Sequence, residues 1–160
     1  MNPASVPASL ERRPERADDE PFLASLFATV QPTPLLQLDP TLRDALVRHQ
    51  HAGQAMTYRA RYPDGRFELV ECSGLPVGRV VTGLSKEALT LVDLAFLPAW
   101  RGRGLGTALI RALQDEARAA GTEMRLTVMA GNDAALRLYL RLGFRIAARS
   151  ETDLTLRWRP

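Results

Sequence analysis

The stretch AFLPAWRGRGLGTALIRAL, residues 95–113, joins an apolar run to an amphipathic run through three glycines at alternate positions. A loop between a strand and a helix presents backbone N–H groups that have no acceptor inside the helix, at the positive end of the helix dipole. Glycines remove the side chains that would keep a ligand away from this backbone. The sequence therefore predicts an anion site, for a phosphate or pyrophosphate group. Its residues are Arg101, Gly102, Arg103, Gly104, Leu105, Gly106 and Thr107.

Two common phosphate-binding motifs do not fit this loop. A P-loop requires Gly-Lys followed by Ser or Thr, and the chain has no such run. A dinucleotide-binding G-x-G-x-x-G motif requires a third glycine, but that position holds Thr107 when counted from Gly102 and Leu109 when counted from Gly104. A tight turn that holds no ligand is the alternative interpretation.

Hydrophobic periodicity predicts strands and helices in mixed order before the loop. Residues 88–97 are nearly all apolar, as expected of a central strand buried on both faces. The earlier elements are an edge strand over Leu10–Arg13, a helix capped by Asp18 or Asp19, a helix over 41–58 capped by Asp39 or Thr41, and strands over 66–72 and 77–83.

Beyond the loop, an apolar stripe predicts a long helix that ends at Gly121, with Gln114 on its outer face. The residues of the stripe are Leu105, Ala108, Leu109, Ala112, Leu113, Ala117 and Ala120. A strand over 123–130 follows. Residues 136–142 alternate with period two, which is a strand pattern. We nevertheless predict a helix there, because Asn132 and Asp133 are good N-caps, the run is rich in helix formers and Gly143 follows it. Two strands, over 144–149 and 153–158, complete the chain.

Length and composition predict one domain over residues 1–160, with 1–9 flexible. The net charge is +3, but the arginines alternate with carboxylates and no series of stacking aromatics accompanies them, so we expect no nucleic-acid partner. No apolar run approaches the roughly 20 residues that span a bilayer, and the N-terminus lacks the apolar core of a signal peptide. We therefore expect no membrane contact and a cytoplasmic location. The single cysteine, Cys72, is expected to pack, and no Cys/His cluster suggests a metal.

Two motifs resemble those of a known family. Arg101-x-x-Gly104-x-Gly106, at the end of VDLAFLP, resembles the acetyl-CoA signature of the GNAT N-acetyltransferase superfamily. NDAALRLYLRLGFR, residues 132–145, resembles the N-x-x-A-x-x-L-Y-x-x-x-G-F segment of the same family, and RRPERADDEPFLASLF, residues 12–27, is similar to its first strand and helix. The resemblance rests on the two motifs occurring together and in this order.

The resemblance implies a fold of the α/β class, in the broad sense of a mixed α+β sheet. About six to seven strands would be flanked by about four helices, with two parallel strands splayed apart at the coenzyme site. It also implies that acetyl-CoA is the acyl donor and that no metal takes part. The pyrophosphate would lie on the amides of Gly102 to Thr107, and the pantetheine arm would pair with the backbone of Leu94, Ala95 and Phe96. Asn132 would hold the arm near the thioester, cap its helix, or do both.

With the motif, Tyr139 is the expected catalytic residue. An amine that attacks a thioester expels a thiolate, and a phenol of pKa about 10 stays protonated at neutral pH and can donate to that sulfur. No nucleophile for an acyl-enzyme is apparent, so direct transfer in a ternary complex is expected. Without the motif, a packed aromatic side chain would be the preferred interpretation of Tyr139.

The general base is not assigned. Thr90 and Thr127 occupy the positions where several family members carry a glutamate, and neither can serve. Asp93 lies on the expected strand, but simple alternation places it opposite Leu94 and away from the site. The other candidates are Glu68, Glu71, His49 and His51; the two histidines are interpreted as solvated surface residues.

The resemblance implies that the acceptor is a primary amine, either a small molecule or a protein amino group. Its groove would be formed by residues 28–58 and 147–155, with Gln50, Gln54, Tyr58 and Tyr62 as polar contacts. The acyl-chain preference is not readable, and a monomer or a homodimer is expected. The absent glutamate leaves a second hypothesis open, a non-catalytic acyl-CoA-binding module with a regulatory or assembly role.

Overall fold

The computed structural model describes residues 9–30 and 37–160, which form one seven-stranded sheet with helices on both faces. The predicted flexibility of residues 1–9 falls almost wholly outside the described residues. The strands are β1 (Leu10–Pro14), β2 (Arg66–Cys72), β3 (Leu75–Leu84), β4 (Ala88–Phe96), β5 (Glu123–Met129), β6 (Arg145–Arg149) and β7 (Asp153–Trp158). The helices are α1 (Glu20–Ala28), α2 (Pro40–Arg61), α3 (Leu105–Ala120) and α4 (Asp133–Arg141), with short 3-10 turns at Ala17–Asp19 and Pro98–Trp100.

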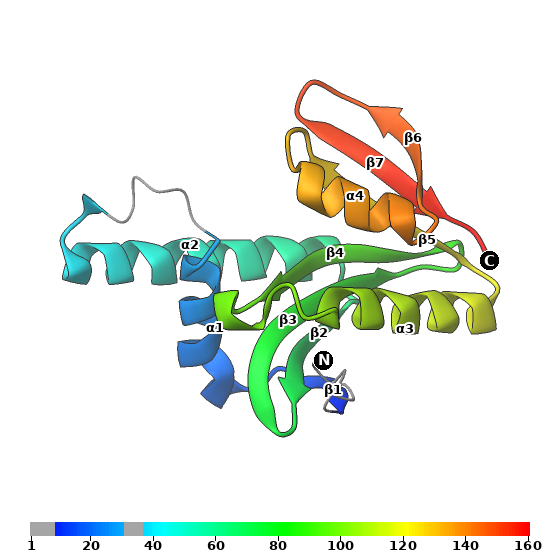
Figure 1. Cartoon of the computed structure of the whole chain (residues 1–160). Helices are drawn as coiled ribbons and strands as arrows, with labels where there is room; N and C mark the ends of the chain where they lie inside the picture. Colours follow the sequence, from blue (N-terminus) through cyan, green and yellow to red (C-terminus); the bar gives the residue numbers. More distant parts are fainter. Residues whose placement is uncertain (1–8, 31–36) are drawn as a thin grey trace, which may run out of the picture.

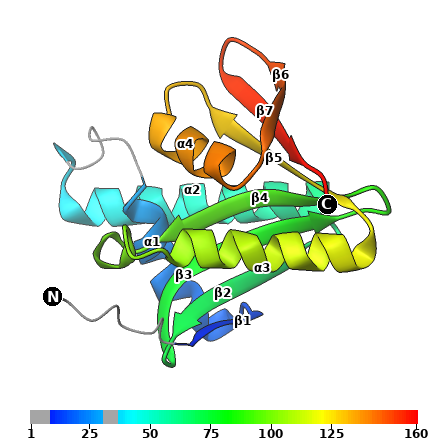
Figure 2. The same cartoon turned by 45° about the vertical axis from the view of Figure 1, so that its right-hand side comes forward.

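The sheet runs in the order β1-β2-β3-β4-β5-β7-β6 and is antiparallel except between β4 and β5. That parallel pair is short, extending only from Ala88 opposite Glu123 to Leu91 opposite Leu126, although both strands continue beyond it. Figures 1 and 2 show β5, β7 and α4 diverging from β4 past this point. The mixed sheet and its splayed parallel strands are thus confirmed, and the splay opens the sheet where the glycine loop begins.

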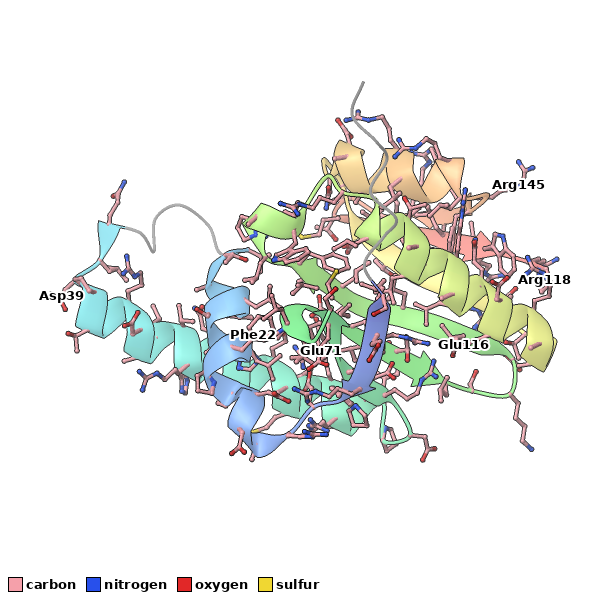
Figure 3. All side chains as sticks on the ribbon, turned by 60° about the horizontal axis from the view of Figure 1, so that its bottom comes forward. Phe22, Asp39, Glu71, Glu116, Arg118 and Arg145 are labelled. Carbon is pink, nitrogen blue, oxygen red and sulfur yellow. The ribbon has the colours of Figure 1, made fainter. Side chains whose placement is uncertain are left out.

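α2 and α3 cover opposite faces of the sheet (Figures 1 and 2). α3 and α4 share the main core, in which Leu109 and Leu113 of α3 pack with Leu126 of β5 and Leu156 of β7. α1 packs against α2 and β3 on the other side. Asp39 caps α2 as predicted, its carboxylate accepting from the N–H groups of Thr41 and Leu42, and it lies at the far end of that helix (Figure 3).

The helical interpretation of residues 136–142 is confirmed. Asn132 is the N-cap of α4 and its side-chain oxygen accepts from the Ala135 N–H at 3.3 Å. Leu138, Tyr139 and Leu142 pack against the core, so the period-two pattern did not decide the structure of this segment. The caps and the helix-forming composition did.

The prediction that Gln114 faces solvent is wrong. Gln114 is buried, and its amide donates to the Leu142 carbonyl at the end of α4 at 2.8 Å. Three alanines predicted on the apolar stripe, Ala108, Ala112 and Ala120, are exposed instead. The side of α3 that becomes buried depends on where α4 packs. The spacing of residues within α3 carries no information about the position of α4.

A β-bulge in β4 overturns the expectation for Asp93. Val81 of β3 lies opposite Asp93, whereas its neighbour Thr82 lies opposite Leu91, so Val92 is an extra residue without a partner on β3. An extra residue reverses the alternation of side chains along the rest of a strand. Asp93 therefore lies on the side of the sheet that faces α1 and α2.

Candidate active site

A cavity of about 390 Å³ lies where β4 and β5 separate. Asp93, Leu94 and Ala95 of β4 line it on one side, together with Met129 at the end of β5 and Asn132 before α4. α1, the turn after it and α2 close the other side, and Arg79 of β3 completes the lining. The residues on that side are Leu23, Leu26 and Phe27 of α1, Val30 of the turn, and His51 and Gln54 of α2. Leu94, Ala95 and Asn132, predicted to lie along the pantetheine arm, are thus brought together in one place.

The glycine loop exposes its backbone next to this cavity. Gly102 and Gly104 have φ angles of 70° and 80°, a conformation that L side chains rarely adopt. A Cβ atom at either position would meet no atom within 4 Å, so packing does not require a glycine there. Ala108 is the first residue of α3 whose N–H bonds back to the loop, at the Gly104 carbonyl. The N–H groups of Leu105, Gly106 and Thr107 have no acceptor earlier in the helix and are available to an anion.

The two loop arginines are held by the protein in different ways. Arg101 donates through Nε to the Phe96 carbonyl at 2.9 Å and through Nη2 to Thr29 Oγ1 at 3.2 Å, which ties the loop to β4 and to the end of α1. Phe96 itself is buried in the core and does not line the cavity. Arg103 is exposed and lies 4.9 Å from the centre of the Trp100 ring. Of the two, Arg103 is the one with freedom to meet a phosphate.

Tyr139 is half-buried on α4, where its ring meets Phe144 edge-on at 5.7 Å. Burial raises the pKa of the Tyr139 phenol, and the negative charge of Asp93 raises it further. The hydroxyl therefore keeps its proton at neutral pH, as a proton donor must. Tyr139 itself is not among the residues that line the cavity.

Asp93 belongs to a buried charge cluster with Arg79 and Glu15. Arg79 is 3% exposed and donates through Nε to Glu15 at 2.6 Å, while its Nη1 lies 3.3 Å from Gln54 Oε1 and 3.7 Å from Asp93. Burial raises the pKa of the Asp93 carboxyl, which Arg79 and the Leu94 N–H oppose by lowering it. Asp93 is thus more basic than an ordinary aspartate and lies on the cavity wall.

His51 is buried, not solvated as predicted. It is 3% exposed, its Nδ1 lies 3.1 Å from Glu20 Oε1, and its ring lies 5.5 Å from that of Phe27. Its Nε2 has no hydrogen-bond partner among the residues that the structure describes. A histidine held by a carboxylate at one ring nitrogen presents the other nitrogen as an acceptor.

The remaining base candidates lie elsewhere. Glu68 pairs with Arg12 at 3.3 Å and Glu71 with Arg13 at 2.7 Å, both across the β1–β2 edge, and His49 is exposed. In the same edge region Glu116 of α3, labelled in Figure 3, contacts Arg12 and Arg66. Thr90 and Thr127, Gln50, Tyr58 and Tyr62, and residues 147–155 do not line the cavity.

Some cavity residues were not foreseen from the sequence. Arg79 carries a signal that could have found it, because it is a lone charge within PVGRVVTG and a buried charge requires a partner, here Glu15 outside the cavity. The α1 residues Leu23, Leu26 and Phe27 look like ordinary core positions in the sequence. Only the packing of α1 beside the splay shows that they border a cavity.

Comparison with known proteins identifies the family. The sequence model of the Acetyltransferase (GNAT) family matches residues 33–144, more than half of the chain, and the protein belongs to this family. An uncharacterised N-acetyltransferase of Methanocaldococcus jannaschii is 36% identical over 92 residues, which are 52% of this chain and 40% of that protein. The chain therefore spans less than half the length of this relative.

Solved structures share the fold. The PaiA N-acetyltransferase of Thermoplasma acidophilum, solved in complex with coenzyme A, superposes with a TM-score of 0.71 at 16% identity, covering 95% of this chain and 99% of that one. Arabidopsis thaliana Naa50, in complex with a bisubstrate analogue of CoA and a peptide, gives 0.66 at 17% identity, covering 95% and 99%. At these identities the likeness concerns the fold.

Two other properties bear on ligands and location. No group of three or more His, Cys, Asp or Glu side chains placed to hold a metal ion occurs within residues 9–30 and 37–160. Over the same part of the chain, no helix is both long and apolar enough to cross a membrane.

Proposed function

We propose that this protein transfers an acetyl group from acetyl-CoA to a primary amine. The observation that carries the proposal is the cavity at the splay, which places the carboxylate of Asp93 beside the backbone of Leu94 and Ala95 and the side chain of Asn132. A thioester held along that backbone and an ammonium held by that carboxylate would meet in one enclosed space. Membership of the GNAT family supports the same reaction.

The glycine loop fits the coenzyme's pyrophosphate. Its open backbone at Gly102 and Gly104 and the free amides at the start of α3 would bind the two phosphates, with Arg103 adding charge. The pantetheine amides would pair with β4 past Leu91, where β5 no longer occupies that edge. Arg101 would act indirectly, by holding the loop against β4.

The chemistry divides between two side chains. The acceptor binds as an ammonium, and Asp93 accepts one of its protons, helped by a pKa that burial raises. The freed lone pair forms the C–N bond to the thioester carbonyl, the C–S bond then breaks, and a second proton leaves the nitrogen for water as the amide forms. Tyr139 donates its phenolic proton to the departing thiolate, because its raised pKa keeps the phenol protonated at neutral pH. The proton released from the nitrogen to water then reprotonates Tyr139.

His51 would carry the proton taken up by Asp93 to solvent. It lines the same cavity and its positive form would lower the pKa of Asp93, so the two are electrostatically coupled. On the far side of its ring lies Glu20, whose side chain is 57% exposed. A proton passed from Asp93 through a bridging water to Nε2, and released from Nδ1 to Glu20, would reach solvent without crossing the apolar wall.

The observed position of Asp93 removes the main reason for the second hypothesis, a non-catalytic acyl-CoA-binding module. That hypothesis rested on the lack of an acidic side chain at the expected positions of the two central strands. The bulge in β4 supplies one from an unexpected position. Whether the protein acts as a monomer or a homodimer stays a prediction from the sequence.

Calorimetric titration with acetyl-CoA tests the proposal, comparing the wild type with Gly104→Glu. The new side chain would place a negative charge over the loop amides, so we expect heat of binding with the wild type and none with the variant. Gly74→Glu is the matched control, because Gly74 also has a positive φ, of 77°, and open space around it, but lies in the β2–β3 turn. Equal binding by all three proteins would contradict the coenzyme site.

A further inference from the structure

The acceptor side of the cavity has a definite chemical character. Its wall is apolar over Leu23, Leu26, Phe27, Val30 and Met129, and its polar side is formed by Asp93 with Arg79, Gln54 and His51. An acceptor that fills this space must present an amine to one side and hydrocarbon to the other.

Two wall residues expose apolar surface that no contact within residues 9–30 and 37–160 covers. Val30 is 55% exposed and Met129 is 71% exposed, and they come from opposite sides of the splay, the turn after α1 and the end of β5. Large apolar side chains left open to water at a cavity are typical of a binding surface. Here they extend the apolar wall outward from the buried Leu23 and Leu26.

The charges on the polar side favour a cation and disfavour a carboxylate. Glu15 pairs with Arg79 at 2.6 Å and with Arg59 at 3.4 Å, whereas Asp93 lies 3.7 Å from Arg79 alone. Glu15 is thus neutralised outside the cavity, and Asp93 is the carboxylate that lines it. A bound ammonium would pair with Asp93, whereas a substrate carboxylate in its place would meet a like charge.

The nearby arginines do not change this balance. Arg79 already contacts Glu15, Gln54 and Asp93, and its remaining Nη2 is buried away from solvent. Arg101 is engaged by the Phe96 carbonyl and by Thr29. Neither is placed to bind a carboxylate on the acceptor.

We propose that the acceptor is a primary amine carried by an apolar aliphatic or aromatic group, with no carboxylate next to the amine. This inference rests on the proposed acetyl transfer and narrows its substrate class. Free α-amino acids are excluded by their carboxylate, and short polar amines gain nothing from the apolar wall.

Steady-state acetylation assays with matched amines test the inference. Phenethylamine, phenylalanine and phenylalaninamide share one ring and one amine, and only phenylalanine has a carboxylate next to the amine. Isoamylamine, which lacks the carboxylate, and leucine, which has it, repeat the comparison with an aliphatic group. We expect kcat/KM to be at least about tenfold higher for phenethylamine and phenylalaninamide than for phenylalanine, with ethanolamine also poor. A short peptide that begins with phenylalanine is assayed beside phenethylamine. The comparison of the two kcat/KM values distinguishes a small free amine from the N-terminus of a protein chain as the acceptor.

A pair of exposed methionines supplies the variant and its control. Met129→Ser removes part of the apolar wall at a position open enough to tolerate the change, and should raise KM for phenethylamine several-fold more than KM for ethanolamine. Met56→Ser alters a methionine that is 75% exposed but lies outside the cavity, and should leave both values unchanged. Turnover that favours the free amino acids would overturn the inferred substrate class but not the proposed acetyl transfer. An effect of Met129→Ser that is equal for both amines would have the same consequence. No turnover of any amine would overturn the transfer reaction as well.

Discussion

At the scale of single residues, the proposed reaction gives Asp93 and Tyr139 opposite roles, Asp93 as the proton acceptor and Tyr139 as the proton donor. Both have raised pKa values for the same first reason, burial, but the consequences differ. A raised pKa makes the carboxylate a better proton acceptor near neutral pH. In the phenol it preserves the proton that the leaving sulfur requires.

We predict that Asp93→Asn and Tyr139→Phe alter the pH dependence of acetylation differently. In the wild type, kcat/KM should rise as Asp93 ionises and level off above its raised pKa. In Asp93→Asn it should be roughly a hundredfold lower at neutral pH and climb until the amine's own pKa, because only free amine then reacts. Tyr139→Phe should lower the plateau of kcat by a similar factor without moving the acid limb.

Controls for these variants come from residues of the same type elsewhere in the chain. Asp115→Asn on the exposed face of α3 and Tyr62→Phe at the end of α2 should leave the profiles unchanged. Asp93→Asn should also unfold at the same or a higher temperature at neutral pH. The folded chain binds the Asp93 proton more tightly than the unfolded chain does, so ionisation of this carboxyl costs stability as pH rises. An unchanged acid limb in Asp93→Asn would exclude Asp93 as the base.

At the scale of elements, one ion pair joins the edge strand to the first helix. Asp19, at the start of α1, receives two hydrogen bonds of 2.8 Å from Arg13 of β1 and one of 2.7 Å from the Arg16 N–H. The pKa of the Asp19 carboxyl is lowered to about 2, and the hydrogen bond from Arg13 is the main cause. This pair sets the angle at which α1 leaves β1 and so positions the α1 wall of the cavity.

We predict that Asp19→Asn lowers the free energy of unfolding by about 1–2 kcal/mol at pH 7, measured by urea denaturation. Because the folded pKa is depressed, this contribution is fully present above about pH 4 and is lost as pH falls toward about 2. The difference between wild type and variant should shrink over that window. Asp18→Asn, at the exposed neighbouring position, is the control and should cost little at either pH. A constant difference from pH 7 to pH 3 would show that the charge is not responsible.

At the scale of the whole molecule, the splay divides the sheet but not the core. Side chains from both sides pack together: Leu91 of β4, Leu113 of α3, Leu156 of β7 and Phe144 belong to one buried cluster. Gln114 adds a hydrogen bond from α3 to the end of α4. The two halves should therefore unfold as one unit.

We predict a single unfolding transition with the same urea midpoint by far-UV circular dichroism and by the fluorescence of Trp158, measured in Trp100→Phe. Leu113→Ala, at a fully buried position, should lower the free energy of unfolding by about 2–5 kcal/mol and shift both signals equally. Leu84→Ala, at a position that is 45% exposed, should have a much smaller effect. Separate transitions would show that the β5–β7 half folds independently.

The chain by itself determined the elements and the place of the glycine loop, because these depend on near neighbours in sequence. Alternate glycines between a strand and a helix, an Asn132 cap and a Gly121 end are local signals, and the structure has the elements that they predict. Tertiary structure alone decided which side chains line the cavity. One extra residue in β4 turned Asp93 toward α1 and α2, and the packing of α4 buried Gln114. Burial of His51 and the pairing of Arg79 with Glu15 depend on contacts between segments far apart in the chain, which no local pattern encodes.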